Sequence, residues 1–460
     1  MLKPESLDAV EQMGREPGAQ MTNSNDGNNP LTLRYAESFR CIGSDCEDTC
    51  CTGWRVPVDR DIYLRYQDLP ESPLNTLIRE SIERVPEAEN SGRKPLFAII
   101  RLNSENRCPL LTSDQLCRIH LEYGEAFLPH TCATYPRVSH SLGGVTETAL
   151  TLSCPEAARL VLLHPDLLLS NLEADAVPQQ PAACTDPEEN SPLRPWMRPV
   201  RDVVLRIITH REYPLWQRLF LIGVFCTRLD AISGAATAGG AAPDLSTFLA
   251  EFDAAVESSA LRGSMQALPA DSRTQLDAVL LLAGLMLQKS RVGPRFLECV
   301  RAFTAGIGNG PNATLESLTA HYETAYQRHF APFFSSHPQI LENYLINTVV
   351  RLRFPFGRDN YAPEAERSAS RQFALVAAHF ALIRGLLIGV AGYHGERFST
   401  EHVIHTVQAA TKHFEHHAEF LTRLDTWLQE KNLNNPRALA ILVNEPVPSP
   451  TGSTNPLAPA

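Results

Sequence analysis

The chain has 460 residues, of which 43% are hydrophobic and 20% are charged, so it can bury a substantial core in about two to four domains. Its formal net charge is −11 and it contains no long run of Lys or Arg, which argues against a nucleic-acid partner. Residues 1–20 have no apolar segment and mix acids with bases, so they predict neither a secretory signal nor a transit peptide. We therefore expect a cytoplasmic protein without a membrane partner.

The first part of the chain is predicted to contain a leader, a cysteine-rich module and a linker. Residues 1–30 are polar and aperiodic, as expected of a disordered leader. Residues 31–165 combine many cysteines with short apolar pieces at 97–100 and an alternating run at 145–152, which predicts an irregular α+β module built around a metal. Residues 166–195 are rich in Pro and acids and predict a linker at a domain boundary.

The second part, residues 196–443, is predicted to be a mainly helical domain. Apolar residues recur at steps of three and four after Pro214, and the helical pattern resumes at Leu245 and over 276–287. Between them, residues 234–244 predict a flexible loop. The most apolar stretch, 374–392, carries a His and an Arg near its middle and therefore predicts a buried helix instead of a membrane span. The fold class expected is α+β, predominantly α, followed by a disordered tail at 444–460.

Eight of the eleven cysteines fall within residues 41–154, which indicates a metal site, because cytosolic thiols stay reduced. They are Cys41, Cys46, Cys50, Cys51, Cys108, Cys117, Cys132 and Cys154. Sulfur ligands select zinc, copper(I) or an iron-sulfur cluster. The adjacent pair Cys50-Cys51 disfavours one mononuclear zinc, because neighbouring side chains rarely reach the same ion. Eight thiols exceed the four that one zinc or one 4Fe-4S cluster needs, so some have other roles.

Several motifs resemble the flagellin lysine-N-methylase family. In the cysteine region these are Cys-x4-Cys-x3-Cys-Cys-x-Gly-Trp from Cys41, Cys-Pro-Leu-Leu from Cys108, Cys-Arg-Ile from Cys117 and Cys-Ala-Thr-Tyr-Pro-Arg from Cys132. Further stretches, at 150–159, 341–345 and 353–356, are similar to the same family. The likeness spans residues 31–420, and the radical-SAM spacing Cys-x3-Cys-x2-Cys is absent from the first cysteine group.

The resemblance implies a protein-lysine N-methyltransferase that uses S-adenosylmethionine and a 4Fe-4S cluster to methylate flagellin. It maps the family's cysteines onto the eight thiols named above without saying which of them bind iron. The residues that bind the methyl donor and the general base are not identified. The alternative is a protein without catalytic activity, either a metal-chelating cluster carrier or a zinc-stabilised interaction module.

Methyl transfer to lysine also constrains the site. The acceptor amine has a pKa near ~10.4 and must lose its proton, so a base or an apolar, positively biased pocket is expected near the cluster. Nearby candidates are His120, His130, Tyr135 and Glu156, and each is also a plausible hydrogen-bond partner of a ligand sulfur. If the sulfonium donor binds the cluster, one iron must lack a cysteine ligand.

Three other signals are weaker. Gly306-Ile-Gly308-Asn-Gly310 lacks the preceding strand of a nucleotide-binding motif and predicts a surface turn. His413 and His417 lie four residues apart, a metal-ligand spacing, but a solvated polar face is the simpler interpretation. Arg351 and Arg353, beside Asn343 and Asn347, are predicted to line a domain interface, and the alternative is contact with a carboxylate group of a ligand.

Overall fold

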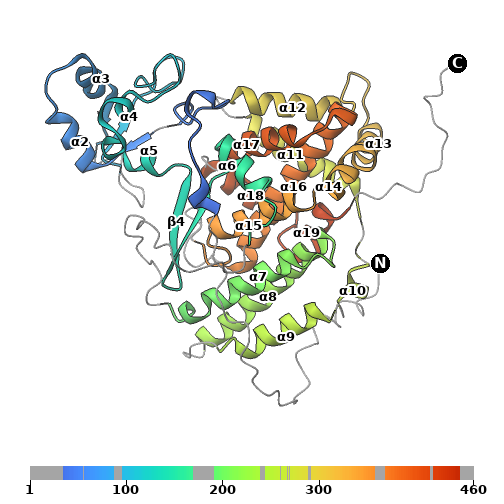
Figure 1. The fold of residues 1–460 in the computed structure, drawn as a ribbon. Coiled ribbons are helices and arrows are strands. Elements are labelled where there is room, and N and C mark those ends of the chain that lie inside the picture. Colours follow the sequence, from blue (N-terminus) through green and yellow to red (C-terminus); the bar gives the residue numbers. More distant parts are fainter. Residues whose placement is uncertain are drawn as a thin grey trace.

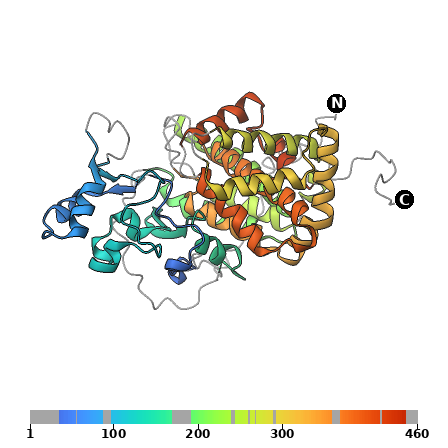
Figure 2. The same cartoon turned by 90° about the horizontal axis from the view of Figure 1, so that it is seen from above.

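The computed structural model describes residues 35–54, 56–86, 96–168, 191–238, 244–258, 261–266, 268, 270–288, 292–357, 368–414 and 418–445. A small lobe, which carries most of the cysteines, projects from one side of a larger helical domain (Figures 1 and 2). The structure is mostly helical with small N-terminal sheets, as the sequence predicts. The predicted leader 1–30 and most of the predicted linker and tail lie outside the described residues.

The small lobe is built on a three-stranded antiparallel sheet with the order β1-β3-β2. The strands are β1 (Val56–Val58), β2 (Ile82–Arg84) and β3 (Ala98–Ile100), and Val56 faces Ile100 in the register. Between β1 and β2 lie α2 (Arg60–Gln67) and α3 (Pro73–Ser81). Helix α3 begins where Ser72 accepts a hydrogen bond from the Asn75 N–H at 3.1 Å, with Pro73 at the first helical position.

Two short helices, α4 (Arg118–Tyr123) and α5 (His130–Thr134), complete the lobe. Its buried core is small and includes Val58, Tyr66 and Ile78. Cysteine side chains make up a large part of that core, since Cys108 is buried in it and Cys51, Cys117 and Cys132 pack against it. A lobe with so few apolar residues has little hydrophobic stabilisation of its own.

A hairpin connects the lobe to the helical domain. Strand β4 (Arg137–Leu142) pairs with β5 (Val145–Leu150), and the turn uses Gly143 and Gly144 at φ of 58° and 85°, where a side chain would be strained. The hairpin is followed by α6 (Pro155–Leu162). Strand β5 and α6 both contact α15 (Gln339–Arg351), and α6 also contacts α17 (Thr400–Phe414). The chain from β5 onward therefore belongs to the larger core.

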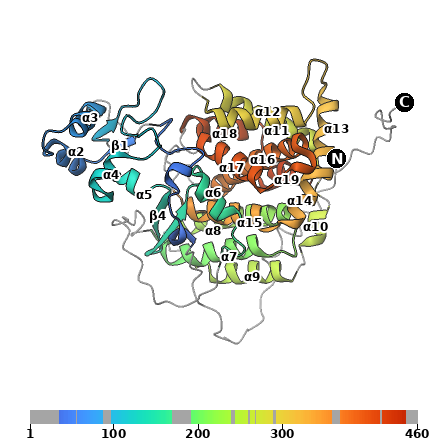
Figure 3. The ribbon, with the colours of Figure 1, turned by 45° about the horizontal axis from the view of Figure 1, so that its top comes forward.

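The helical domain packs around α16 (Ala369–His394), which contacts helices on several sides (Figures 1 and 3). Its other helices are α7 (Met197–Thr209), α8 (Leu215–Ala238), α9 (Ser246–Glu257), α10 (Arg262–Gln266), α11 (Ser272–Leu287), α12 (Pro294–Gly306), α13 (Leu315–Ala325), α14 (Ala331–Ser336), α18 (Ala418–Glu430) and α19 (Pro436–Val443). Helices α12 and α16 approach closely because Gly306 and Gly389 have no side chains: a Cβ on Gly306 would lie 1.8 Å from the Gly389 carbonyl oxygen.

The segment Ala369–Arg397 is long and apolar enough to cross a membrane, with a mean hydropathy of 2.0, but its most apolar window is completely buried inside the protein. It is the central core helix, as the sequence predicts. The periodic residues predicted in α8 are Leu215, Leu219, Ile222, Phe225 and Leu229; the last four are buried as predicted, and Leu215 is partly buried.

One prediction in this half is wrong in part. The loop expected at 234–244 begins later, because α8 continues to Ala238. The Ala-rich run 235–238 extends a helix that already exists, and adding Ala to a formed helix is favourable in spite of Gly234.

Candidate functional site

The cysteine loop, residues 41–54, lies between the small lobe and the helical domain. A 3-10 turn, η2 (Gly43–Asp45), separates Cys41 from Cys46. The following Cys50-Cys51 pair is held by the backbone, because the Cys51 carbonyl accepts a hydrogen bond from the Cys108 N–H at 2.8 Å. The Trp54 indole N–H donates to the Cys50 carbonyl at 2.7 Å. The loop is thereby tied to the segment that carries Cys108.

Four cysteines form a group that we call the lobe set: Cys51, Cys108, Cys117 and Cys132. All four belong to the small core of the lobe. Burial raises the pKa of the Cys132 thiol, and the charges of Cys51, Cys117 and Cys108 raise it further. Burial raises the pKa of the Cys108 thiol to about 12, with contributions from the charges of Cys51 and Cys117. The four sulfurs therefore lie within range of one another's charge.

A second group, which we call the junction set, consists of Cys41, Cys46 and Cys154. Cys154 stands directly before the first turn of α6 and is buried in the core of the helical domain. Burial raises the pKa of its thiol to about 12, with contributions from the charges of Cys46 and Cys41. Cys50 lies between the two sets, because the charges of both Cys132 and Cys154 contribute to its raised pKa.

Cys50 and Cys51 differ in their proton affinity although they are adjacent. The Cys50 thiol donates a hydrogen bond to the Cys51 sulfur, which raises the pKa of Cys50 and lowers that of Cys51. Thr49 and the positive charges of Lys412 and Arg107 also lower the pKa of Cys51. Cys51 therefore has the lower pKa of the two thiols.

The chemistry of this donor set fits a soft metal. Backbone N–H groups two or three residues further along the chain donate toward the sulfurs of Cys46, Cys108, Cys117 and Cys154. Such N–H···S hydrogen bonds stabilise thiolates and tune iron-sulfur clusters. Within the described part of the chain, however, no three His, Cys, Asp or Glu side chains are arranged to hold one metal ion. The thiols are thus neighbours without forming a coordination shell.

The remaining cysteines lie apart from these sets. Cys226 is buried in the core of the helical domain, as its place beside the apolar stripe of α8 predicts. Cys299 is also buried, and its sulfur lies 3.9 Å from the His405 carbonyl oxygen. Cys184 lies outside the described residues.

Helix α17 anchors the cysteine loop to the helical domain. The Lys412 ammonium lies 2.8 Å from the Asp48 carboxylate and 3.3 Å from the Thr49 carbonyl oxygen. One turn earlier, the Gln408 amide donates to Asp48 at 2.7 Å and to the Ser153 carbonyl at 2.9 Å. Sequence reasoning did not identify these residues, because a single Lys or Gln on a helix carries no signal of its distant partner.

The four candidates for a base are placed differently by the fold. His120 and His130 are exposed. The Tyr135 hydroxyl lies 3.0 Å from the Ser153 hydroxyl, and Glu156 forms an ion pair with Arg159. Arg159 also contacts Glu47 of the cysteine loop at 2.9 Å. Tyr135 and Glu156 are therefore parts of the junction between the lobe and the helical domain.

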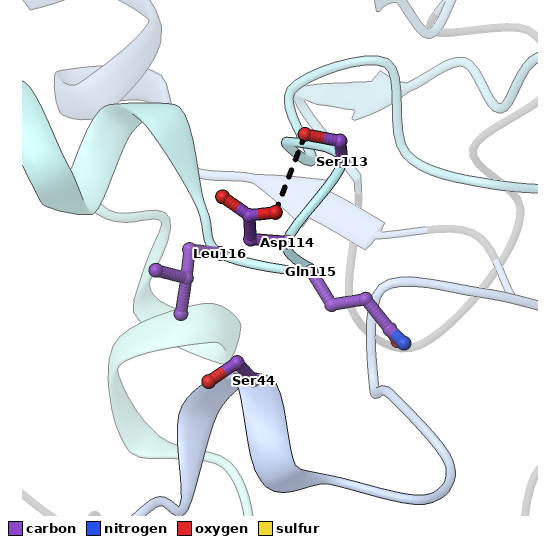
Figure 4. Close-up of a pocket in the computed structure, with 5 residues that line it drawn as sticks. All are labelled: Ser44, Ser113, Asp114, Gln115 and Leu116. Carbon is purple, nitrogen blue, oxygen red and sulfur yellow. Dashed lines mark hydrogen bonds between the residues drawn. The ribbon is translucent and has the colours of Figure 1, made fainter.

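Figure 4 shows a polar hollow of about 460 Å³ in the same region, between Ser44 of η2 and the loop 113–116. The Ser113 hydroxyl donates to the Asp114 carboxylate there, at a distance of 3.5 Å. The hollow is open and shallow, and its lining side chains are small or flexible.

Two asparagines of α15 join the β5–α6 segment to the helical domain. Asn347 is fully buried, donates to the Leu150 carbonyl at 2.9 Å and accepts from the Leu150 N–H at 3.3 Å. Asn343 donates to the His164 carbonyl at 2.7 Å. Both residues thus support the contact between the β5–α6 segment and the helical domain.

The prediction of a solvated histidine face is wrong for His413. Only 6% of this residue is exposed; its ring stacks on Phe296, and its Nε2 lies 2.9 Å from the Met286 carbonyl oxygen. His417 lies outside the described residues. The glycine-rich stretch after α12 is a turn, as predicted, with Gly308 at a φ of 70°.

The fold and the site together define a protein in which a thiol-rich lobe docks on a helical domain, with the cysteine loop held by α6 and α17. A family model described as the FliB lysine N-methylase C-terminal domain matches residues 201–442. The chain therefore belongs to the FliB lysine N-methylase family.

Curated relatives are similar over a shorter segment. The flagellar biosynthetic protein FliU of Salmonella muenchen is 30% identical over 135 residues, which cover 29% of this chain and 77% of FliU. Lysine-N-methylases of Salmonella typhimurium strain LT2 and Salmonella choleraesuis strain SC-B67 are each 30% identical over 135 residues. That segment spans 32% of the length of each lysine-N-methylase. No solved structure matches the chain.

Proposed function

We propose that this protein is a cytoplasmic S-adenosylmethionine-dependent N-methyltransferase that methylates lysine side chains of flagellin. The observation that carries the proposal is the match of the lysine N-methylase family model to residues 201–442, the half of the chain on which the thiol-rich lobe docks. The names of the relatives, a lysine-N-methylase and a flagellar biosynthetic protein, support lysine as the acceptor and flagellin as the substrate.

The proposal includes a 4Fe-4S cluster held by the lobe set. Cys51, Cys108, Cys117 and Cys132 supply the four thiolates that one such cluster needs, and all four belong to one small core. With all four thiolates bound, the cluster would have no open iron position. If one iron were also to hold the donor as a Lewis acid, only three of these cysteines would remain as ligands.

The residues of the chain itself position the lobe. Asp48, Gln408 and Lys412 hold the cysteine loop against α17, and Arg159 holds Glu47 beside the first turn of α6. The positive charge of Lys412 also stabilises the Cys51 thiolate. These contacts keep the thiols at the wall of the helical domain.

A zinc-stabilised module is the second candidate, because four thiolates in one core are also the ligand set of a structural zinc. The two candidates differ in metal, in sulfide and in their response to the methyl donor.

The test is anaerobic purification of the full chain, followed by analysis of iron, zinc and acid-labile sulfide and by visible spectra with and without S-adenosylmethionine. We expect about four irons and four sulfides, a spectrum that the donor perturbs, and flagellin that gains the mass of methyl groups. Stoichiometric zinc without sulfide, together with unmodified flagellin, would overturn the methylase proposal and support the zinc-stabilised module.

A further inference from the structure

A pocket outside the cysteine sets opens between three helices of the helical domain. Its volume is about 470 Å³, and its walls come from α12, α16 and α17. The side chains that give it chemical character are Glu298, Arg301, Tyr393, His394, His402 and His405. The rest of the lining includes Ala302, Ala305 and Val390, so most of the wall is apolar.

The histidines of this pocket are held in place by their neighbours. The rings of His394 and His402 stack with centroids 3.6 Å apart. The Ser399 backbone N–H donates to Nδ1 of His402 at 3.1 Å, so this nitrogen is an acceptor and the neutral ring carries its proton on Nε2. Burial lowers the pKa of His394, His402 and His405, and the charges of nearby arginines lower it further. The three rings are therefore neutral near pH ~7.

Nε2 of His405 lies in the wall of the pocket. This nitrogen is buried and has no hydrogen-bond partner among the described residues, and the nearest carboxylate oxygen, from Glu298, lies 3.6 Å away. Burying an unpartnered imidazole nitrogen is costly. A polar group of a ligand that forms a hydrogen bond with Nε2 would remove this cost.

The pocket lies close to the cysteine loop. His405, Gln408 and Lys412 follow one face of α17 at steps of three and four residues, and the last two bind Asp48. The rise of an α-helix places His405 about 10 Å along the axis from Lys412. The charge of Asp48 also acts on His405. A side chain bound at His405 would thus face the region where the lobe meets the helical domain.

We propose that this pocket binds the acceptor lysine side chain of the protein substrate and that His405 removes its proton. The inference rests on the proposed methylase function. Ala302, Ala305 and Val390 match the methylene stem, and Glu298, which is exposed at the rim, matches the incoming ammonium. The positive charge of Arg301 on the same wall favours the neutral amine once the proton has left.

The reaction at this site balances as follows. Nε2 of His405 takes one proton from the lysine ammonium, and the imidazolium so formed is stabilised by Glu298. The amine lone pair attacks the methyl carbon of the sulfonium donor, an N–C bond forms, and the C–S bond breaks with its electron pair on sulfur. The products are an N-methylammonium and a neutral thioether, and the imidazolium returns its proton to water.

Two experiments test the pocket. The first is photo-crosslinking of the full chain to a short peptide, acetyl-Ala-Ala-X-Ala-Ala-amide, in which X is a diazirine-bearing lysine analogue, followed by mass-spectrometric mapping. We expect crosslinks on α12, α16 and α17 at the pocket, and we expect Ala305→Phe, which fills the pocket, to abolish them. The matched control is Ala320→Phe, an equally exposed alanine on α13, which should crosslink like wild type.

The second experiment measures methyl transfer to flagellin by the same proteins. Glu298→Gln should raise KM about tenfold, the effect of losing one charge contact, and should also lower kcat, because the imidazolium loses its carboxylate. His405→Gln should lower kcat about 100-fold with little change in KM. Glu251→Gln, at an exposed position on α9, is the control for charge removal.

The outcomes separate the pocket from the proposed function. Crosslinks confined to other surfaces, or an Ala305→Phe variant with wild-type kcat/KM, would overturn the pocket even if flagellin is methylated. The protein could instead show crosslinks in the pocket that Ala305→Phe abolishes and yet transfer no methyl group. This result would support a lysine-binding pocket and overturn the proposed methylase function.

Discussion

The Lys412 ammonium and the Asp48 carboxylate, 2.8 Å apart, join the helical domain to the cysteine loop across 364 positions of the chain. Both side chains are largely buried, with exposed fractions of 23% and 19%. Asp48 precedes Cys50 by two residues, so this ion pair fixes the loop that contributes Cys51 to the lobe set and Cys41 and Cys46 to the junction set.

Asp48→Asn should loosen this loop. The substitution leaves the Lys412 charge half-buried without its carboxylate, which we expect to lower the free energy of local opening by about 1.5–3 kcal/mol. Hydrogen exchange measured by mass spectrometry should therefore accelerate in residues 41–54, while α16 stays protected. Glu212→Gln, which removes an exposed ion pair with Arg262, is the control and should change little. Unchanged exchange in the loop would show that the ion pair is dispensable.

Asn347→Ala should destabilise the whole protein. It removes both hydrogen bonds to Leu150 and the acceptor of the Tyr35 hydroxyl, all in a buried position. Leaving these backbone and hydroxyl groups without partners should lower the free energy of unfolding by about 2–4 kcal/mol. Urea denaturation measures the effect, and the exposed Asn309→Ala is the matched control. A loss similar to that of the control would mean that Asn347 does not join the β5 segment to α15.

Substitution of a lobe-set cysteine should reduce metal binding, whereas substitution of a cysteine in the helical core should not. Cys132→Ser in the lobe set should lower the iron content and increase proteolysis of residues 41–134 more than that of the helical half, because metal binding and folding of this region are linked. Cys226→Ala, in the helical core, should keep the iron of wild type. Equal iron in both variants would exclude the lobe set as the cluster ligand. Removal of the metal with a chelator should reproduce the proteolysis of Cys132→Ser.

His379 should make stability depend on pH. Burial in α16 lowers its pKa to about 3, with a further contribution from the charge of Arg351, so the folded protein holds it neutral. The unfolded chain binds a proton below its ordinary pKa of about 6.5. Stability is therefore lost as the pH falls through this range, by about 2–3 kcal/mol at about pH 4.5.

His379→Leu should remove this loss, which urea denaturation at about pH 7 and about pH 4.5 will measure. The exposed His321→Leu is the control and should follow wild type. A His379→Leu protein with the full acid sensitivity of wild type would show that other groups cause it.

The helical half was largely predictable. The stripe Leu219, Ile222, Phe225 and Leu229 and the long apolar run of α16 report burial directly, because helix packing imposes a period of 3.6 residues. The end of α8 was predicted too early. Residues 234–244 contain both Ala, which favours a helix, and Gly, which favours a loop, and only the structure shows that α8 continues to Ala238. His413 was misjudged for a related reason, because its burial depends on Phe296 and Met286, which are distant in sequence.

The sequence by itself determined the clustering of cysteines in the N-terminal region, the helical character of the second half and the family resemblance, because spacing, periodicity and composition are local properties of the chain. Only the tertiary structure decided that Cys51 and Cys132 share one core while Cys154 joins another. It also decided that Glu298, Tyr393 and His405 line one pocket and that Lys412 meets Asp48. Such contacts join residues far apart in the chain, and they form only when separate helices pack face to face, so no local pattern encodes them.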